Sequence, residues 1–358
     1  MQNMFPTIIK FLVLLSLFLY SCTTTKPESE PLHPASSYYK SGLEYLKKGQ
    51  MLHAENNFIR SIELDANYAP AHEGLARVLL EKGQLHEAAL HVNRALQLDS
   101  GWLPAQLLKG RIELQRGNYE KAVSLLRQTI AKSKTAKATG NRKEMMASAL
   151  YWIGVARFRQ GNWAEAERVF AAYLRIDPSN GSAKEYWQQA AENRKLLEDK
   201  PEWIRELTLK PEITRGQLAL LLYNTLLPML KKNNADSALF GSGFANNDSL
   251  IVCELNKFNL MPLYPDSTFK AGKKAVRGDL ALALGQVLNG GETKTASVQP
   301  MVFDDVARVF PFYAYVNRLV ALQIMLPVNE HVFGTHRPLN GLEALRAIEK
   351  TKLIVRKR

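Results

Sequence analysis

A period of 34 residues runs through the first half of this 358-residue chain. Gly49, Gly83 and Gly117 follow one another at that spacing, each with an alanine five residues later. A fourth unit, with Gly161, comes after a ten-residue insertion. A unit of this length cannot bury its own apolar face, so neighbouring units must stack, and about three are needed for a stable core. The period therefore constrains the first half of the chain to a solenoid.

Apolar helical stretches flank each of these glycines, and the arrangement resembles the tetratricopeptide repeat. Landmark residues of that family recur in the first, third and fourth units: Tyr38, Gly42, Tyr45, Ala54 and Phe58; Gly110, Tyr119 and Ala122; Gly154, Ala166, Phe170 and Pro178. The resemblance implies an all-α fold in which residues 37–200 form a superhelical solenoid of four repeats with a capping helix over residues 181–200. It also implies a concave groove that binds a protein partner.

Mapping the repeat onto the chain gives four groove positions: Tyr39, Arg77, Arg111 and Tyr151. The two arginines are 34 residues apart and so occupy equivalent places, where their guanidiniums could hold a carboxylate-bearing partner. Alternatively, they pair with neighbouring acids such as Glu73 and Glu113. The Lys and Asn set that grips chaperone tails in some family members is not matched, which disfavours a chaperone co-factor.

The insertion around residues 132–143 is rich in lysine. Two interpretations stay open at this stage: a longer helix pair joined by a basic loop, or an extension that contacts a specific partner. A solvated loop is the simpler of the two.

The amino terminus predicts where the protein resides. Residues 11–20 form an apolar run that is too short to span a membrane but suits a secretion signal over residues 1–21. Leu19, Ser21 and Cys22 resemble a bacterial lipobox, which implies a lipid anchor on Cys22. Thr23, in place of an aspartate, favours the periplasmic face of an outer membrane, and residues 22–36 read as a flexible tether. The alternative is an ordinary signal peptide with an incidental cysteine.

A second pattern replaces the period after residue 200. A short motif recurs over residues 213–219, 275–281 and 339–345, each time just before an apolar helical stretch. Together with residues 260–269 and 303–306, which precede the second and third copies, it resembles the S-layer homology domain. The resemblance implies that residues 201–358 form a helical three-unit module that holds peptidoglycan or a wall-linked polysaccharide.

Four residues of the motif are candidates for that polysaccharide site: Thr214, Arg215, Arg277 and Asp279. Each arginine would stand at the first position of a helix, where free backbone amides already favour anions. The third copy has Gly341 where an arginine is expected, so at most two pockets look competent. An alternative without any ligand is that Thr214 and Gln217 recur only as a capping box.

Catalysis and nucleic-acid binding find little support. The chain has no nucleophile elbow, no phosphate-binding glycine loop and no Cys/His cluster with metal spacing, so we expect no enzyme activity, no cofactor and no metal. The resemblance to the S-layer homology domain implies a structural role for the neighbouring carboxylates of Asp304 and Asp305. The net charge of +13 is spread as +7 over residues 35–200 and +6 over residues 201–358, without a basic tail.

The sequence thus predicts a non-enzymatic, lipid-anchored envelope protein that tethers a membrane to the cell wall and recruits an envelope protein through the repeat groove. A different hypothesis is a pilotin-like assembly factor for a secretion, pilus or outer-membrane complex. In that case the second module is reused for protein contacts.

Overall fold

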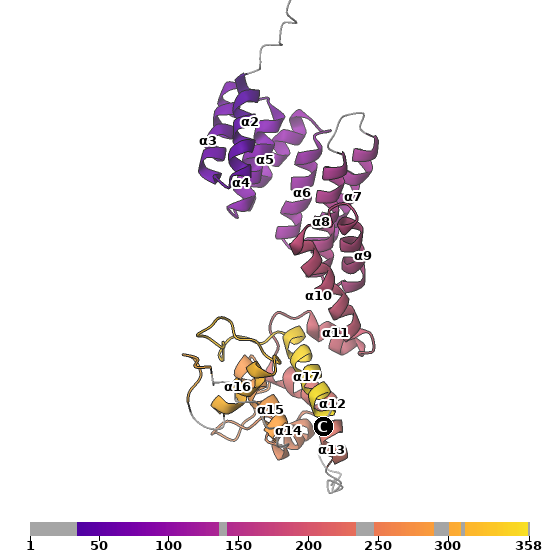
Figure 1. Cartoon of the computed structure of the whole chain (residues 1–358), viewed down its shortest axis with the longest axis vertical. Coiled ribbons are helices and arrows are strands. Elements are labelled where there is room, and N and C mark those ends of the chain that lie inside the picture. The colour runs from indigo at the N-terminus through magenta and orange to yellow at the C-terminus, as the bar shows by residue number, and fades with distance from the viewer. Residues whose placement is uncertain (1–33, 136–141, 234–246, 290–300, 309–311, 357–358) are drawn as a thin grey trace, which may run out of the picture. The chain divides into compact units, whose positions relative to one another are not determined.

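The structure, a computed structural model, describes residues 34–135, 142–233, 247–289, 301–308 and 312–356. Within these ranges it is helical, with no strand and two isolated β-bridges (Figure 1). The all-α prediction is therefore confirmed. No described helix is both long and apolar enough to cross a membrane. The predicted signal peptide and Cys22 lie outside the described residues.

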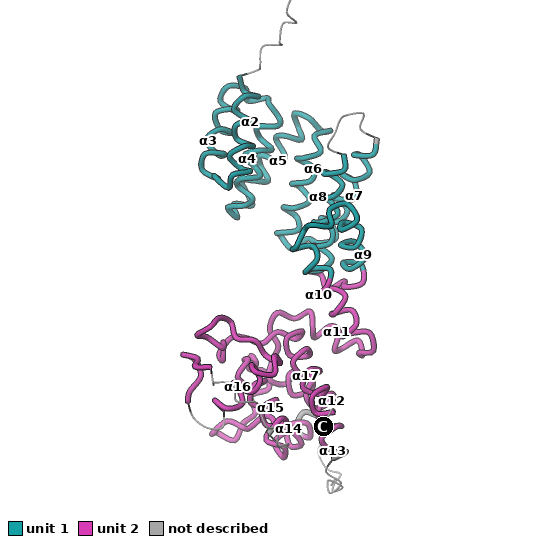
Figure 2. The backbone as a smooth tube through the Cα atoms, in the orientation of Figure 1, with its two compact units in different colours: residues 1–159, 165–187 teal, residues 160–164, 188–358 magenta. Residues whose placement is uncertain are grey.

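The chain divides into two compact units (Figure 2). The first runs to residue 159 and includes residues 165–187, while the second comprises residues 160–164 and 188–358. The division falls inside one helix, somewhat before the boundary at residues 200 and 201 that the sequence pattern suggested. The last ten residues of that helix pack with the second unit, where Asn193 accepts hydrogen bonds from Arg346.

Antiparallel helix pairs make up the first unit. The helices are α2 (Pro34–Lys47), α3 (Met51–Leu64), α4 (Ala69–Glu81), α5 (Leu85–Leu98), α6 (Leu103–Gln115), α7 (Tyr119–Thr135), α8 (Arg142–Arg159) and α9 (Trp163–Leu174). They are followed by α10 (Gly181–Leu197). Each pair packs against the next, with α4 against both α2 and α6, which is the stacked arrangement that the period predicted.

The periodic glycines close the turns within the helix pairs. Gly49, Gly83, Gly117 and Gly161 all have a φ between 72° and 81°, a left-handed conformation that side chains other than glycine rarely adopt. Each one ends a first helix and lets the chain reverse into the second helix of the same repeat. The 34-residue spacing therefore records the recurrence of one backbone turn.

Other small residues set how closely the helices approach. Phe58 is fully buried between Gly42 and Gly74, and a methyl group added to either glycine would lie less than 3 Å from its ring. Gly154 is placed in the same way against Phe170. The aromatic side chains thus fill the space that the missing side chains leave, which is the packing expected for this type of repeat.

Two segments can be compared in detail with the expectation. The tether was predicted to reach residue 36, but α2 already begins at Pro34. At the insertion, α7 and α8 have 17 and 18 residues whereas the helices of the first two repeats have 13 or 14, which agrees with a longer helix pair; contact with a specific partner stays a prediction. Residues 136–141, the centre of the expected basic loop, are outside the described ranges.

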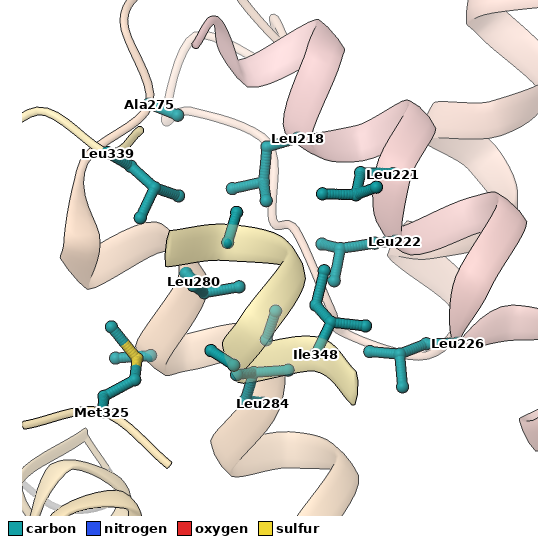
Figure 3. Close-up of a cluster of buried hydrophobic side chains, with 14 of the residues drawn as sticks. Leu218, Leu221, Leu222, Leu226, Ala275, Leu280, Leu284, Met325, Leu339 and Ile348 are labelled. Atoms are coloured by element: carbon teal, nitrogen blue, oxygen red, sulfur yellow. The ribbon is translucent and has the colours of Figure 1, made fainter. Parts of the chain in front are cut away.

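The second unit is a compact helical body. Its helices are α11 (Glu202–Thr208), α12 (Arg215–Thr225), α13 (Leu227–Asn233), α14 (Asn247–Lys257), α15 (Arg277–Asn289), α16 (Phe312–Ala321) and α17 (Gly341–Arg356). α12, α15 and α17 each start within one copy of the recurring motif, and their apolar side chains meet in one core (Figure 3). Leu218, Leu222, Leu280, Leu284 and Ile348 contribute to it.

A closed ring of backbone hydrogen bonds joins the three copies of the motif. The amide of Ile213 donates to the carbonyl of Leu339, Leu339 donates to Ala275, and Ala275 donates back to Ile213, each over 2.9 Å. Antiparallel bridges from Thr214 to Lys274 and from Val276 to Pro338 flank the ring. The three helices therefore start around one common centre.

The third copy departs from the other two for a steric reason. Gly341 occupies the position of Arg215 and Arg277, and its α-carbon lies against the end of α11. A β-carbon at this position would lie 2.0 Å from the carbonyl oxygen of Leu207. A backbone segment of the chain thus occupies the space that a side chain would need, which explains why the arginine is missing here.

Replacing Gly341 by alanine tests this close approach. The added methyl group overlaps the Leu207 carbonyl, so we expect Gly341→Ala to lower the free energy of unfolding by about 1–3 kcal/mol, as overpacking typically does. Gly272→Ala is the matched control, because a β-carbon at Gly272 meets nothing within 4 Å. Urea denaturation of both variants measures the difference. An equal response of the two would contradict the steric explanation.

Candidate functional site

Arg215 begins α12 and is 4% exposed. Its Nη1 pairs with the carboxylate of Asp279, Nη2 donates to the carbonyl of Pro262 over 3.0 Å, and Nε donates to that of Phe269 over 3.3 Å. The guanidinium also lies 4.8 Å from the ring centroid of Tyr264. One side chain therefore fastens the first motif to the loop that precedes the second.

Arg277 repeats this arrangement one motif later. It is 2% exposed, donates from Nη2 to the carbonyl of Leu326 over 2.6 Å, and places Nε 3.0 Å from the carboxylate of Glu343. Its guanidinium lies 4.7 Å from the ring centroid of Phe333. Burial lowers the pKa of Arg277 from its ordinary value. The second motif is thereby fastened to the loop that precedes the third.

The other two predicted site residues cap the helix starts. The hydroxyl of Thr214 accepts from the amide of Gln217 while the Gln217 side chain accepts from the amide of Thr214, which completes a capping box. In the second copy Asp279 accepts from the amide of Val276 over 3.0 Å. The structure thus brings all four predicted residues to the junctions between motifs, with internal partners for each. Ligand binding by their side chains stays a prediction.

A pocket of about 380 Å³ opens beside the first junction. α12 contributes Thr214, Gly216, Gln217, Ala219 and Leu220; α14 contributes Ile251 and Val252; the loop before the second motif contributes Phe269, Ala271 and Gly272. Small residues on facing walls leave the space free. A glycine packs closely against the preceding loop at both junctions: a β-carbon on Gly216 would lie 3.2 Å from the β-carbon of Ala271, and one on Gly278 would lie 2.9 Å from the methyl group of Thr335.

The sequence-based prediction missed most of the residues that line this pocket. Gly216, Ala271 and Gly272 carry no functional group, so chemistry-bearing patterns do not single them out. Only their position in the sequence could have identified them. They lie within or just before the copies of the recurring motif, on two segments that the ring of hydrogen bonds brings together.

Asp305 organises the loop of the third unit. Its carboxylate accepts hydrogen bonds from the backbone amides of Phe333, Gly334 and Thr335 at 2.8, 2.8 and 2.5 Å. Although burial alone would raise the pKa of Asp305, these amides lower it below the ordinary value. Asp304 is exposed. The expected structural role of this carboxylate pair thus belongs to Asp305.

At the predicted groove of the first unit, Tyr39 and Arg77 converge on Glu73. The carboxylate of Glu73 is fully buried and accepts from Arg77 Nη2 over 2.6 Å, with the Tyr39 hydroxyl 3.4 Å away. Burial raises the pKa of Glu73, and the charge of Arg77 opposes that rise. Arg77 is therefore paired with an acidic residue of the same helix, which is the second of the two alternatives drawn from the sequence.

Arg111 has a different partner from the one suggested. It pairs with Glu81 over 2.6 Å and stacks 4.3 Å above the ring of Trp152. Glu113 instead accepts from Asn118 over 2.8 Å and pairs with Arg116. Neither arginine of the pair offers a bare guanidinium to a partner's carboxylate.

Tyr151 lines a second pocket, of about 580 Å³, in the first unit. The other lining residues come from α8, from the end of α9 and from the turn between α9 and α10: Lys143, Glu144, Ala147, Ser148, Trp152, Tyr173, Ile176, Asp177 and Asn180. The Tyr151 ring also lies at the centre of an aromatic cluster with Phe170, Tyr173 and Tyr186. Among the described residues, no group of three or more His, Cys, Asp or Glu side chains could hold a metal ion.

Comparison with known families assigns the first unit. Residues 39–101 and 107–181 match the family model of the tetratricopeptide repeat. This part of the chain therefore contains tetratricopeptide repeats, which are a scaffold for protein interaction, as the resemblance implied. No curated protein matches the chain.

Solved structures of similar fold come from several proteins. PilF of Pseudomonas aeruginosa is 18% identical with a TM-score of 0.39, over 57% of this chain and 93% of that one. MamA of Desulfovibrio magneticus RS-1 is 17% identical with a TM-score of 0.34, over 46% and 94%. YrrB, a tetratricopeptide-repeat protein with an unusual peptide-binding site, is 19% identical with a TM-score of 0.34, over 52% and 92%. Likeness at this level does not bear on what the chain binds.

The carboxylate of Asp305 predicts a specific response to acid. A pKa depressed in the folded state stabilises the fold at pH values above the unfolded pKa of about 3.9, and the contribution is lost as the pH falls through the folded value. We expect Asp305→Asn to lower the free energy of unfolding by about 1–3 kcal/mol at pH 7, since buried amides lose a charged acceptor. The deficit should shrink between about pH 5 and pH 2.

Urea denaturation across that pH range measures the effect, and Asp304→Asn is the matched control because its carboxylate is exposed. A deficit that is independent of pH, or equal in the two variants, would contradict the role given to the three amides.

Proposed function

We propose that this protein is a lipid-anchored tether of the bacterial envelope: the second unit holds cell-wall polysaccharide, and the tetratricopeptide repeats recruit an envelope protein. The observation that carries the first part is the pocket of about 380 Å³ between the first two motifs. The pocket lies beside the start of α12 and the loop before the second motif, which the buried side chain of Arg215 joins. In a module built from such motifs, this junction has room for a ligand.

The chemistry of the pocket suits a sugar. One wall presents the side chains of Thr214 and Gln217, which can exchange hydrogen bonds with hydroxyl groups. The other walls are apolar, with Ile251 and the ring of Phe269, as expected for the less polar face of a pyranose. Binding sites of this kind combine apolar walls with a few well-placed polar groups.

The surroundings favour an anionic polymer. Lys270, Lys273 and Lys274 are exposed on the loop that carries Phe269, Ala271 and Gly272, and Asp266 and Glu212 pair with two of them. The loop retains a net positive charge, which raises the local concentration of an acidic polysaccharide. Arg215, buried beneath the loop, fixes its position and so preforms the pocket.

The repeats supply the second contact. Tetratricopeptide repeats are interaction scaffolds, and the pocket at Tyr151 and Trp152 provides a recess of about 580 Å³ for a partner's side chains. Arg77 and Arg111 do not line this recess; they shape the predicted groove through their pairs with Glu73 and Glu81. Together with a lipid on Cys22, these contacts give the protein a mechanical role: it holds a membrane, the wall and a partner within reach of one another.

Blocking the pocket tests wall binding. Gly272 has open space around it, so Gly272→Trp should fill the pocket without disturbing the fold. We expect co-sedimentation of the full chain with isolated sacculi to fall at least tenfold in Gly272→Trp. Leu353→Trp is the matched control, because Leu353 is 58% exposed on α17 and does not line the pocket.

Circular dichroism and thermal denaturation confirm that both variants fold. Binding that survives in Gly272→Trp would exclude this pocket as the polysaccharide site. If the unmodified chain does not bind sacculi at all, the tether fails and the assembly-factor hypothesis takes its place.

The anchor is tested separately. In the bacterial host, Cys22→Ser should move the protein from the membrane fraction to the soluble fraction, because the acyl chains that bury many methylene groups in the bilayer are lost. Mass spectrometry of the unmodified protein should show an acylated amino-terminal cysteine. Membrane association that is unchanged in Cys22→Ser, together with an unmodified cysteine, would contradict the lipid anchor.

A further inference from the structure

The pocket at Tyr151 and Trp152 differs in charge from the solenoid around it. Two carboxylates line it, those of Glu144 on α8 and of Asp177 in the turn after α9, against the single ammonium group of Lys143. Residues 35–200 as a whole carry a net charge of +7. The pocket is therefore an acidic recess on a basic solenoid, and a partner that presents a carboxylate does not fit it.

The two carboxylates can still accept a further donor. Among the residues that the structure describes, neither Glu144 nor Asp177 forms an ion pair. Asp177 accepts hydrogen bonds from the Tyr173 hydroxyl over 3.0 Å, from the Ser179 amide over 3.1 Å and from the Ser179 hydroxyl over 2.6 Å. A carboxylate has about four acceptor sites, so Asp177 keeps room for a cationic donor.

Aromatic rings form the other walls of the recess. Tyr151, Trp152 and Tyr173 line it, and the face of such a ring attracts a cation. Trp152 already binds one cation of this chain, because the Arg111 guanidinium lies 4.3 Å from its ring centroid. Arg111 itself does not line the recess, so Trp152 presents a further part of its surface there.

These walls are held in place by contacts within the first unit. The Tyr173 hydroxyl accepts from Nδ2 of Asn180 over 3.0 Å, and Oδ1 of Asn180 accepts from the amide of Ala183 over 2.9 Å at the start of α10. The Tyr151 ring packs edge-on against Phe170, with centroids 6.0 Å apart. A recess that is fixed before its ligand arrives lowers the entropic cost of binding.

Glu144 connects the recess with the predicted groove. Its carboxylate lies within electrostatic reach of Arg77, which is a groove position and forms its own ion pair with Glu73. Tyr151 is a predicted groove position as well, and it lines the recess. A segment that follows the groove can therefore place one side chain in the recess.

We propose that this recess binds the side chain of an arginine in an extended segment of the protein that the repeats recruit. The inference rests on the proposed recruitment of a partner and states the chemistry of that contact. A planar guanidinium can lie on an aromatic ring while its five N–H groups donate to carboxylates, so it matches both kinds of wall at once. A volume of about 580 Å³ lies within the range of about 300–1,000 Å³ that is usual for binding pockets.

The test follows Trp152 directly. The probe is N-acetyl-arginine amide, and N-acetyl-citrulline amide is its matched control, because citrulline has nearly the same shape without the charge. The full chain carries Cys22→Ser, so that no acyl chain can be attached, and ¹⁵N-labelled tryptophan. Nuclear magnetic resonance records the indole signals of the five tryptophans during each titration, and Trp152→Phe assigns the signal of Trp152.

We expect the arginine probe to shift the Trp152 signal with a dissociation constant in the millimolar range, as is usual for so small a ligand. The citrulline probe should bind at least about fivefold more weakly, because it lacks the charge. Glu144→Gln and Asp177→Asn should each weaken binding of the arginine probe to a similar extent. Glu44→Gln should stay within about twofold, because Glu44 is exposed on α2 and does not line the recess.

Equal binding of the arginine and citrulline probes would overturn the proposal, and so would equal binding of the arginine probe by Glu144→Gln and the parent chain. Glu144→Gln decides the question if Asp177→Asn does not fold, because the side chain of Glu144 is exposed. A Trp152 signal that shifts with N-acetyl-glutamate amide and not with the arginine probe would also overturn it, yet would leave the recess as a contact for a partner.

If none of the three probes shifts the Trp152 signal, both the arginine site and the role of this recess in recruitment fail. Wall binding is not affected by any of these outcomes, because the proposed polysaccharide pocket is lined by other residues, in the second unit.

Discussion

In both halves of this chain a single repeat or motif is too small to bury its own apolar surface. Both folds follow from that constraint. In the first unit, helix pairs stack along one direction, so each repeat needs only its neighbours and the close approach that Gly42, Gly74 and Gly154 permit. In the second unit, three helix starts close on themselves through the ring of hydrogen bonds among Ile213, Ala275 and Leu339. An open stack leaves long faces for partners, whereas a closed ring leaves only its junctions.

The junctions of the ring explain why the same arginines look both functional and structural. A guanidinium offers five donors, so Arg215 can satisfy Asp279 and two carbonyls while it stacks on Tyr264. Replacing such a residue strongly lowers the free energy of unfolding, because its buried partners are left unpaired. Loss of binding after an arginine is replaced would therefore not separate a damaged site from a damaged fold, whereas filling the pocket at Gly272 does.

The fold was largely predictable from the sequence, because its signals are local. The glycine period reports a turn that needs positive φ, and Thr214 with Gln217 reports a helix start. The site was less predictable, because its determinants are distant in the sequence. Arg111 pairs with Glu81 rather than with Glu113, and His72 contacts His91 on the other helix of its repeat. Neither contact follows from the spacing of residues on a single helix. Small residues such as Ala271 become informative only once the two walls of a pocket are known.

The first and third junctions of the second unit differ in the space they leave at the helix start, and under the proposed function this difference limits where the protein would hold a polymer. Small residues line a pocket beside the first junction, whereas at the third the carbonyl of Leu207 fills the space that an arginine would need. If a polymer binds only in the pocket beside the first junction, it is held at one point and its repeated sugar units add no avidity. Firm attachment would then depend on the proposed lipid anchor and the proposed repeat-bound partner acting together, since each would raise the effective concentration of the others.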